Sequence, residues 1–169
     1  MKTLKLKHKQ SASWIDVLID DWNWDRVNEW NWFIDNTGRG DRVKRTISPQ
    51  IPLANFILNI SKGIEIDHIS RNVYDNQESN LRVCTHQQNN WNKGIRATNT
   101  SGYIGVTWDK NCKKWRSSVM HYSKQIYIGL FNDKIEAAKA RDIKAIELFG
   151  KFAVLNFPQE GYQNIKDNK

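Results

Sequence analysis

The chain has 169 residues, enough for one compact domain or two small ones, and its 39% hydrophobic and 26% charged residues suit a folded protein with a core. It has no apolar run that could span a membrane, and the opening MKTLKLKHK lacks the apolar region of a secretory signal. Two isolated cysteines, Cys84 and Cys112, give neither a disulfide framework nor a CxxC zinc motif, so we expect a reducing, cytoplasmic setting.

The net charge of +8 is unevenly distributed along the chain. Residues 1–93 carry 13 Lys and Arg against 11 Asp and Glu, a balance of +2, whereas residues 94–158 carry 11 against 5, a balance of +6. A basic half with interleaved aromatic residues suits a polyanion, and nucleic acid is the partner that the pattern favours. The alternative is a solvated surface that only aids solubility.

The first elements are expected to be strands. Residues 2–9, KTLKLKHK, alternate lysines with Leu and His, which predicts an edge strand with a wet lysine face, and residues 13–21 continue as strand. DWNWDRVNEWNW follows, where Trp24, Val27 and Trp30 lie on one helical face and predict a short helix. We expect the tryptophans of this run in the core rather than stacked on bases, because Trp is usually highly buried in small domains.

A turn and a further strand and helix come next. Residues 35–41, DNTGRGD, have the composition of a turn. Residues 42–61 predict a strand followed by a short helix, with Pro52 near the start of that helix.

The segment from 64 to 93 contains the candidate chemistry. EIDHI alternates, which predicts a strand in which Ile64, Ile66 and His68 share one face and Asp67 points to the other. The turn-forming residues that follow predict a loop, and LRVCT predicts a second short strand. THQQNNWNK predicts a helix with Thr85 as its N-cap. The order is strand, loop, strand, helix.

The C-terminal half begins after a polar stretch, KGIRATNTS at residues 93–101, which is expected to be a linker. Three short strand patterns follow at 103–108, 114–120 and 125–131, separated by turn-like residues, and they predict an antiparallel meander.

A helix is expected over residues 132–150. Asp133 and Glu136 have capping-box spacing, and Gly150 stands where a helix stops. An apolar stripe is expected to pack this helix on the sheet, and its members are Ile135, Ala138, Ala145, Ile146 and Phe149. VLNFP then closes the domain, and residues 159–169 are expected to be a frayed tail.

The segments DHIS, SNLRVCT and HQQNNWNK together resemble the HNH nuclease motif, the ββα-metal fold. His68 takes the first position, Asn80 follows twelve residues later in the SNLR phrase, and Asn89 follows nine residues after that. The preceding IPLANFILNISKGIEIDH is similar to the lead-in of phage and intron-encoded HNH endonucleases, and the resemblance covers most of residues 15–93.

The resemblance implies a role for each residue. Asp67 and Asn89 would hold one divalent metal ion, with Mg²⁺ expected and Mn²⁺ as the alternative, because such ions take carboxylate and amide oxygens. His68 would be the general base for the attacking water. Asn80 would hydrogen-bond the loop backbone and hold His68 in place.

Taken singly, each of these residues has a plainer interpretation. An Asp-His pair can be a surface pair, Asn80 can cap a turn, and Asn89 can be a solvated helix residue; their combined spacing favours the nuclease. Histidine is the commonest metal ligand, yet His86 is expected to lie on a neighbouring helical face and to contact DNA phosphate instead. The other phosphate contacts expected near the motif are Arg71, Arg82, Lys93 and Arg96.

Residues 101–158 resemble the AP2 DNA-binding domain through YIGV, KWR, YIGLF, the EAAKARD helix and the closing VLNFP. The resemblance implies a three-stranded sheet that lies in the major groove and a helix that supports it from behind. The family pattern has Arg after the Tyr of the first strand, where this chain has Ile104, and Thr107, Ser118 and Met120 stand at other usual Arg positions.

Because of these departures, specific base contacts are not carried over from the family. The alternative for Trp108 and Trp115 is a place in the core. Lysines are expected to meet phosphate, while Arg116 or Gln125 can read a base edge. The candidate DNA contacts of this half are Trp108, Lys110, Lys113, Arg116, Lys124, Gln125 and Tyr127.

Together the two resemblances predict an α+β protein with an HNH nuclease domain at 1–93, a linker at 94–101, an AP2-like domain at 102–158 and a tail at 159–169. The expected function is metal-dependent cleavage of double-stranded DNA, as in phage and intron homing endonucleases. The alternatives are an inactive DNA-binding regulator and a restriction or structure-specific nuclease. A monomer or weak dimer is expected, with no membrane and no protein partner.

Overall fold

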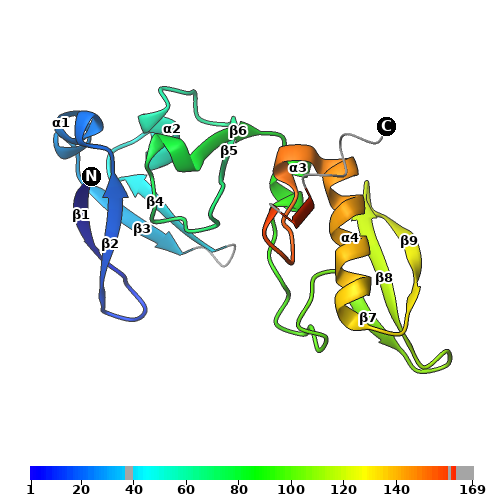
Figure 1. Ribbon diagram of the computed structural model, residues 1–169. Coiled ribbons are helices and arrows are strands. Elements are labelled where there is room, and N and C mark those ends of the chain that lie inside the picture. Colours follow the sequence, from blue (N-terminus) through cyan, green and yellow to red (C-terminus); the bar gives the residue numbers. More distant parts are fainter. Residues whose placement is uncertain (37–39, 160, 163–169) are drawn as a thin grey trace. The chain divides into compact units, whose positions relative to one another are not determined.

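The computed structural model describes residues 1–36, 40–159 and 161–162, and it divides into two compact units, Met1–Asn89 and Asn90–Lys169 (Figure 1). Small antiparallel sheets and a few helices make up both units, which agrees with the expected α+β class. No helix within the described residues is long and apolar enough to cross a membrane. Part of the turn predicted at 35–41 lies outside the described residues.

The first unit starts with the hairpin of β1 (Lys2–Lys7) and β2 (Trp14–Ile19). Leu6 lies opposite Ile15 in this antiparallel pair and is buried, while the lysines that alternate with it are exposed. The alternation of apolar and lysine side chains therefore forms the half-buried strand that it predicts.

Short elements complete the body of this unit. The helical ones are η1 (Asp21–Asn23), α1 (Trp24–Asn28) and α2 (Leu53–Ile57). The strands β3 (Trp32–Asn36) and β4 (Asp41–Arg45) form a second antiparallel pair. Pro52 is the N-cap of α2, as expected for a proline at a helix start. The sequence does not predict β3, because this strand begins at the end of the tryptophan run, whose pattern predicts a helix.

The tryptophans of that run are only partly in the core. Trp32 is buried and its Nε1 donates to Val27 O at 2.9 Å, while Trp24 and Trp30 are half-buried. Trp22 is 70% exposed and donates from Nε1 to Glu78 Oε1 at 3.0 Å, so the prediction that it is buried is wrong. The short helix α1 turns its buried Val27 inward, and Trp22 lies before it in η1.

The end of the first unit has the predicted order of strand, loop, strand and helix. Its elements are β5 (Glu65–His68), η2 (Glu78–Asn80), β6 (Leu81–Cys84) and α3 (His86–Trp91), whose last two residues belong to the second unit. Thr85 caps α3, since its Oγ1 accepts from Gln88 N at 3.2 Å. Ile64 lies outside β5 and is 47% exposed, so it does not share the inner face with Ile66 as predicted.

The second unit is a three-stranded sheet with one long helix lying along it (Figure 1). Its strands are β7 (Val106–Asp109), β8 (Lys114–His121) and β9 (Lys124–Phe131), in the order β7-β8-β9, and the helices are α4 (Lys134–Phe149) and η3 (Gly150–Phe152). The Asp133 carboxylate caps α4 by accepting from Ile135 N and Glu136 N. Ser117 lies opposite Gly129 and Ser118 lies opposite Tyr127, so Ile128 is an extra residue that forms a β-bulge in β9.

Apolar residues of α4 cover one face of this sheet. Ala138, Ala145 and Phe149 are buried against it as predicted. Ile135 is 40% exposed, so its prediction as a core residue is wrong; in the first turn Ala137, which is fully buried, packs in the core instead. Gly105 stands just before β7 with φ at 76°, and its backbone passes so close to β8 that a Cβ there would lie 2.4 Å from Ser118 O.

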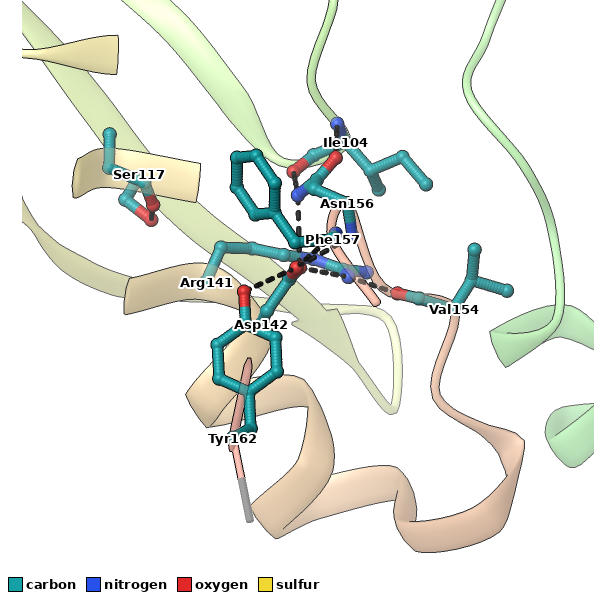
Figure 2. A network of polar contacts seen from close by, with 9 residues as sticks. Ile104, Ser117, Arg141, Asp142, Val154, Asn156, Phe157 and Tyr162 are labelled. Atoms are coloured by element: carbon teal, nitrogen blue, oxygen red, sulfur yellow. Dashed lines mark hydrogen bonds and ion pairs between the residues drawn. The ribbon is translucent and has the colours of Figure 1, made fainter. Parts of the chain in front are cut away.

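A buried carboxylate ties the end of the chain to α4 (Figure 2). Asp142 Oδ2 accepts from Asn156 N at 2.6 Å, from Phe157 N at 3.1 Å and from the Tyr162 hydroxyl at 3.0 Å. Tyr162 is 7% exposed, and burial followed by the Asp142 charge raises the pKa of its hydroxyl. The prediction of a frayed tail is therefore wrong at Tyr162; the tail's other residues 160 and 163–169 lie outside the described residues.

Candidate functional site

The hairpin β5–β6 positions the Asp-His pair. Asp67 lies opposite Arg82 and His68 lies opposite Leu81 in the antiparallel register. Asp67 is 3% exposed, and its Oδ2 accepts from Arg82 Nε at 2.8 Å and from Nη2 at 2.6 Å. Arg82, which was expected to contact DNA phosphate, thus binds Asp67, which was expected to bind the metal ion.

His68 is held by an asparagine that sequence reasoning missed. His68 Nε2 lies 3.3 Å from Asn76 Oδ1, and Asn76 is 1% exposed. Asn76 Nδ2 donates to Val73 O at 3.1 Å, so its oxygen faces the ring and selects the tautomer with the proton on Nε2. Burial, the largest effect, lowers the pKa of His68 below 6.5, against the raising effect of Asn76 and the nearby carboxylates. Near neutral pH the ring is therefore uncharged, with its lone pair on Nδ1.

Asn80 makes the hydrogen bonds that shape the loop between the strands. Its Oδ1 accepts from Ser70 N at 2.8 Å, and its Nδ2 donates to Asp75 O at 2.7 Å. Its backbone oxygen accepts from Ile69 N at 2.8 Å, directly after His68. The buried Asn80 therefore fixes both ends of the loop that follows the histidine.

Asn89 contacts a second residue that sequence reasoning missed, Glu65. Asn89 Nδ2 donates to Glu65 Oε1 at 2.7 Å, while Glu65 Oε2 lies 3.2 Å from His86 Nδ1. Glu65 and Asp67 are two residues apart on β5, so their side chains leave the same face of the strand, ~7 Å apart. The contact thus holds Asn89 to the face of β5 that carries Asp67. No linear spacing signals this pairing, because it joins a strand to a helix.

The other residues predicted near the motif lie at the surface. Arg71, Lys93 and Arg96 are exposed, and the His86 side chain is 84% exposed. Among the described residues no three His, Cys, Asp or Glu side chains group as they would in a metal site. The expected ligands, Asp67 and Asn89, include only one side chain of these four types. A site made of this pair would therefore not form a group of three.

The outer face of the sheet in the second unit carries part of the predicted DNA contacts. The Arg116 guanidinium lies 5.3 Å from the centre of the Tyr127 ring, and these two residues with Asp109 and Leu130 line a shallow pocket. Gln125, on the same side of β9 as Tyr127, donates to Ser118 Oγ at 2.9 Å. The exposed lysines of the predicted set are Lys110, Lys113 and Lys124.

Trp108 lies on the other face of that sheet. It is opposite Trp115 in the β7–β8 register, and the two ring centroids are 5.0 Å apart. Trp115 packs against the core cluster of Val106 and the α4 alanines, so the pair is on the α4 side. Trp108 is 46% exposed at the border of that core, away from Arg116.

Comparison with known proteins gives relatives for both halves, although no family model matches. A mimivirus protein named uncharacterized HNH endonuclease L560 is 30% identical over 138 residues, which are 79% of this chain and 70% of that protein. Protein 3.8 of Escherichia phage T7 is 39% identical over 66 residues, or 39% of this chain and 54% of that protein. An Arabidopsis AP2-like ethylene-responsive transcription factor, At1g16060, is 28% identical over 88 residues, or 52% of this chain.

The lengths of these relatives differ. The chain spans about half of the phage protein and 25% of the plant factor. The mimivirus protein differs in that most of its length is matched. On that match, the chain belongs to the HNH endonuclease family.

Proposed function

We propose that the chain is a metal-dependent DNA endonuclease that hydrolyses phosphodiester bonds at a ββα site. The observation that carries the proposal is the bond from Asn89 to Glu65, because it brings the helix amide to the strand face that bears Asp67. His68 is the next residue on β5, so a carboxylate, an amide and a neutral imidazole come from one hairpin and one helix.

The two oxygen ligands suit a hard divalent ion. Asp67 offers a carboxylate and Asn89 an amide carbonyl, which are ligands that Mg²⁺ or Mn²⁺ prefers. When bound, such an ion polarises the scissile phosphate and stabilises the leaving oxygen. Arg82, which is bound to Asp67, adds a cationic group beside the phosphate.

The remaining residues position and activate water. His68 takes a proton from the attacking water at Nδ1, since Asn76 engages Nε2 and burial favours the neutral ring. Asn80 acts through the loop that it holds, so its role is to keep the His68 ring in place. His86, Arg71, Lys93 and Arg96 contact DNA phosphates from the surface.

DNA affinity comes mainly from the second unit. Its sheet presents Arg116, Gln125 and Tyr127 on the face away from α4, and its lysines neutralise phosphates. Binding should therefore weaken steeply with salt. A phage-type homing endonuclease fits this combination of a small cutting site and a separate DNA-binding unit, and one metal site cuts one strand at a time.

A second candidate is a DNA-binding regulator without nuclease activity, which the similarity to plant transcription factors favours. A cleavage assay separates the two. Supercoiled plasmid is incubated with the protein and Mg²⁺, with a chelator, and with the variants His68→Ala and Asn89→Ala. Asn90→Ala, the neighbouring amide on α3, is the matched control.

The nuclease predicts Mg²⁺-dependent nicking or linearisation that the chelator abolishes. His68→Ala should be slower by about 100-fold or more, the usual contribution of a general base. The Asn90→Ala control should cleave as the unaltered protein does. DNA binding with no Mg²⁺-dependent cleavage would instead favour the regulator, and full activity in His68→Ala would remove the general-base role.

A further inference from the structure

Glu65 has both of its carboxylate oxygens engaged by residues of α3. Oε1 accepts from Asn89 Nδ2 at 2.7 Å, and Oε2 lies 3.2 Å from His86 Nδ1. The Glu65 side chain is 31% exposed, and Asn89 is half-buried. The contacts bridge the start of β5 and the middle of a six-residue helix.

The chemistry of these groups fixes which way the Asn89 amide points. An ionised carboxylate only accepts hydrogen bonds, so the Asn89 amino group must face Glu65. The carbonyl oxygen Oδ1 then lies on the opposite side of the amide plane. A side-chain amide without such a partner can turn over and present its amino group, which binds no cation.

We propose that Glu65 is a positioning residue for the metal site: it holds the Asn89 amide so that Oδ1 faces the cation. This inference rests on the proposed function, in which Asn89 is a metal ligand. His86 contacts the other oxygen of the Glu65 carboxylate and so helps to hold it in place. This is an additional role for His86, which the sequence predicts only as a contact to DNA phosphate. Residues that orient metal ligands in this way typically alter metal affinity about 10- to 100-fold.

The alternative is that Glu65 binds the cation itself. A direct ligand and a positioning residue both weaken binding when they are removed, so single variants do not separate them. A double-mutant cycle does, because a residue that acts only through Asn89 has no further effect once the Asn89 amide is gone.

The experiment measures Mn²⁺ binding to the full chain by titration calorimetry, a readout that needs no cleavage. The variants are Glu65→Gln, Glu65→Ala, Asp67→Ala, Asn89→Ala and Glu65→Ala with Asn89→Ala. Glu29→Gln controls for the lost charge at an exposed site of the same unit. We expect Glu65→Gln and Glu65→Ala each to weaken Mn²⁺ binding about tenfold. The double variant should bind like Asn89→Ala, and Glu29→Gln like the unaltered protein.

A second readout follows the amide itself without metal. In ¹⁵N-labelled protein the Asn89 side-chain NH₂ should exchange its hydrogens more slowly than that of the neighbouring Asn90. Glu65→Gln should reduce the difference, because a glutamine amide can present either its oxygen or its amino group to Asn89. Glu65→Gln keeps the shape of the side chain, so this measurement does not depend on tolerance of Glu65→Ala.

The outcomes separate the inference from the function on which it rests. Suppose that Asn89→Ala weakens Mn²⁺ binding. The positioning role is then overturned if both Glu65 variants bind Mn²⁺ normally, or if Glu65→Ala weakens binding equally in the unaltered protein and in Asn89→Ala. If Asn89→Ala and Asp67→Ala bind Mn²⁺ as the unaltered protein does, the proposed site fails and the role of Glu65 falls with it.

Discussion

Arg82 and Asp67 face each other across the β5–β6 hairpin, and the guanidinium gives two hydrogen bonds to a single carboxylate oxygen, at 2.8 and 2.6 Å. The exposed fractions of the two side chains are 12% and 4%, so the pair is almost entirely removed from water. A buried ion pair contributes little net stability, but removing one partner leaves an uncompensated buried charge.

Arg82→Ala should therefore destabilise the first unit. We expect the free energy of unfolding to fall by about 3–5 kcal/mol, the usual cost of leaving a buried charge unpaired. Urea denaturation followed by circular dichroism measures the change, with Arg71→Ala, an exposed arginine, as the control. An Arg82→Ala protein as stable as the control would show that the pair is not buried in solution.

Gly105→Ala should disrupt the second unit. A Cβ at Gly105 would lie 2.4 Å from Ser118 O, and its φ of 76° is also unfavourable for alanine. Gly102 has a φ of 81° with nothing within 4 Å of the added Cβ, so Gly102→Ala isolates the backbone effect. We expect a loss of about 1–2 kcal/mol at Gly102 from backbone strain and a further loss of about 1–3 kcal/mol at Gly105 from the overlap.

Thermal unfolding of both variants tests this. Equal melting temperatures for Gly102→Ala and Gly105→Ala would mean that the backbone near Ser118 moves to make room for the added Cβ without a loss of stability.

The sequence was informative where one element follows another and much less so where distant segments meet. The order of β5, β6 and α3, the α4 cap at Asp133 and the antiparallel sheet follow from alternation, capping residues and turns. Trp22, by contrast, looks like a core residue by type, yet it is exposed and donates a hydrogen bond to Glu78, 56 residues away. The contact between Glu65 and Asn89 likewise depends on how a strand and a helix pack, which no local pattern encodes.

Tyr162 should contribute to the stability of the second unit, although it lies beyond the predicted domain. Its hydroxyl donates to the fully buried Asp142 carboxylate at 3.0 Å. Tyr162→Phe removes one donor from a buried carboxylate and should cost about 1–3 kcal/mol. Tyr122→Phe, at a tyrosine that is 63% exposed, is the control, and both are compared by denaturant unfolding. No difference between them would argue against a docked Tyr162.

The two cysteines should differ in reactivity with pH. Burial, aided by the charges of Asp67 and Glu65, raises the pKa of Cys84 to about 11, whereas Cys112 is exposed. Since the thiolate is the nucleophile, Cys84 is protonated at pH 8, and its reactive fraction grows about tenfold per pH unit up to its pKa. Brief iodoacetamide treatment at pH 8 should therefore modify Cys112 first, as peptide mass spectrometry can show. Equal labelling of the two would contradict the burial of Cys84.

DNA binding should depend on one face of the sheet in the second unit. Arg116 and Tyr127 lie together on the face away from α4, whereas Trp108 pairs with Trp115 on the α4 side. Arg116→Ala and Tyr127→Ala should each weaken binding by about 1–3 kcal/mol, roughly 5- to 150-fold, if they contact bases. Trp108→Ala should change the affinity little.

Fluorescence anisotropy with a labelled duplex at fixed salt measures these affinities, and circular dichroism checks that each variant is folded. Lys124→Ala gives a further check, because losing one phosphate contact should lower the slope of log affinity against log salt by about one. A folded Trp108→Ala protein that binds more weakly than Arg116→Ala would place the DNA at the edge of the sheet beside β7 instead, since Trp108 is the exposed aromatic residue there.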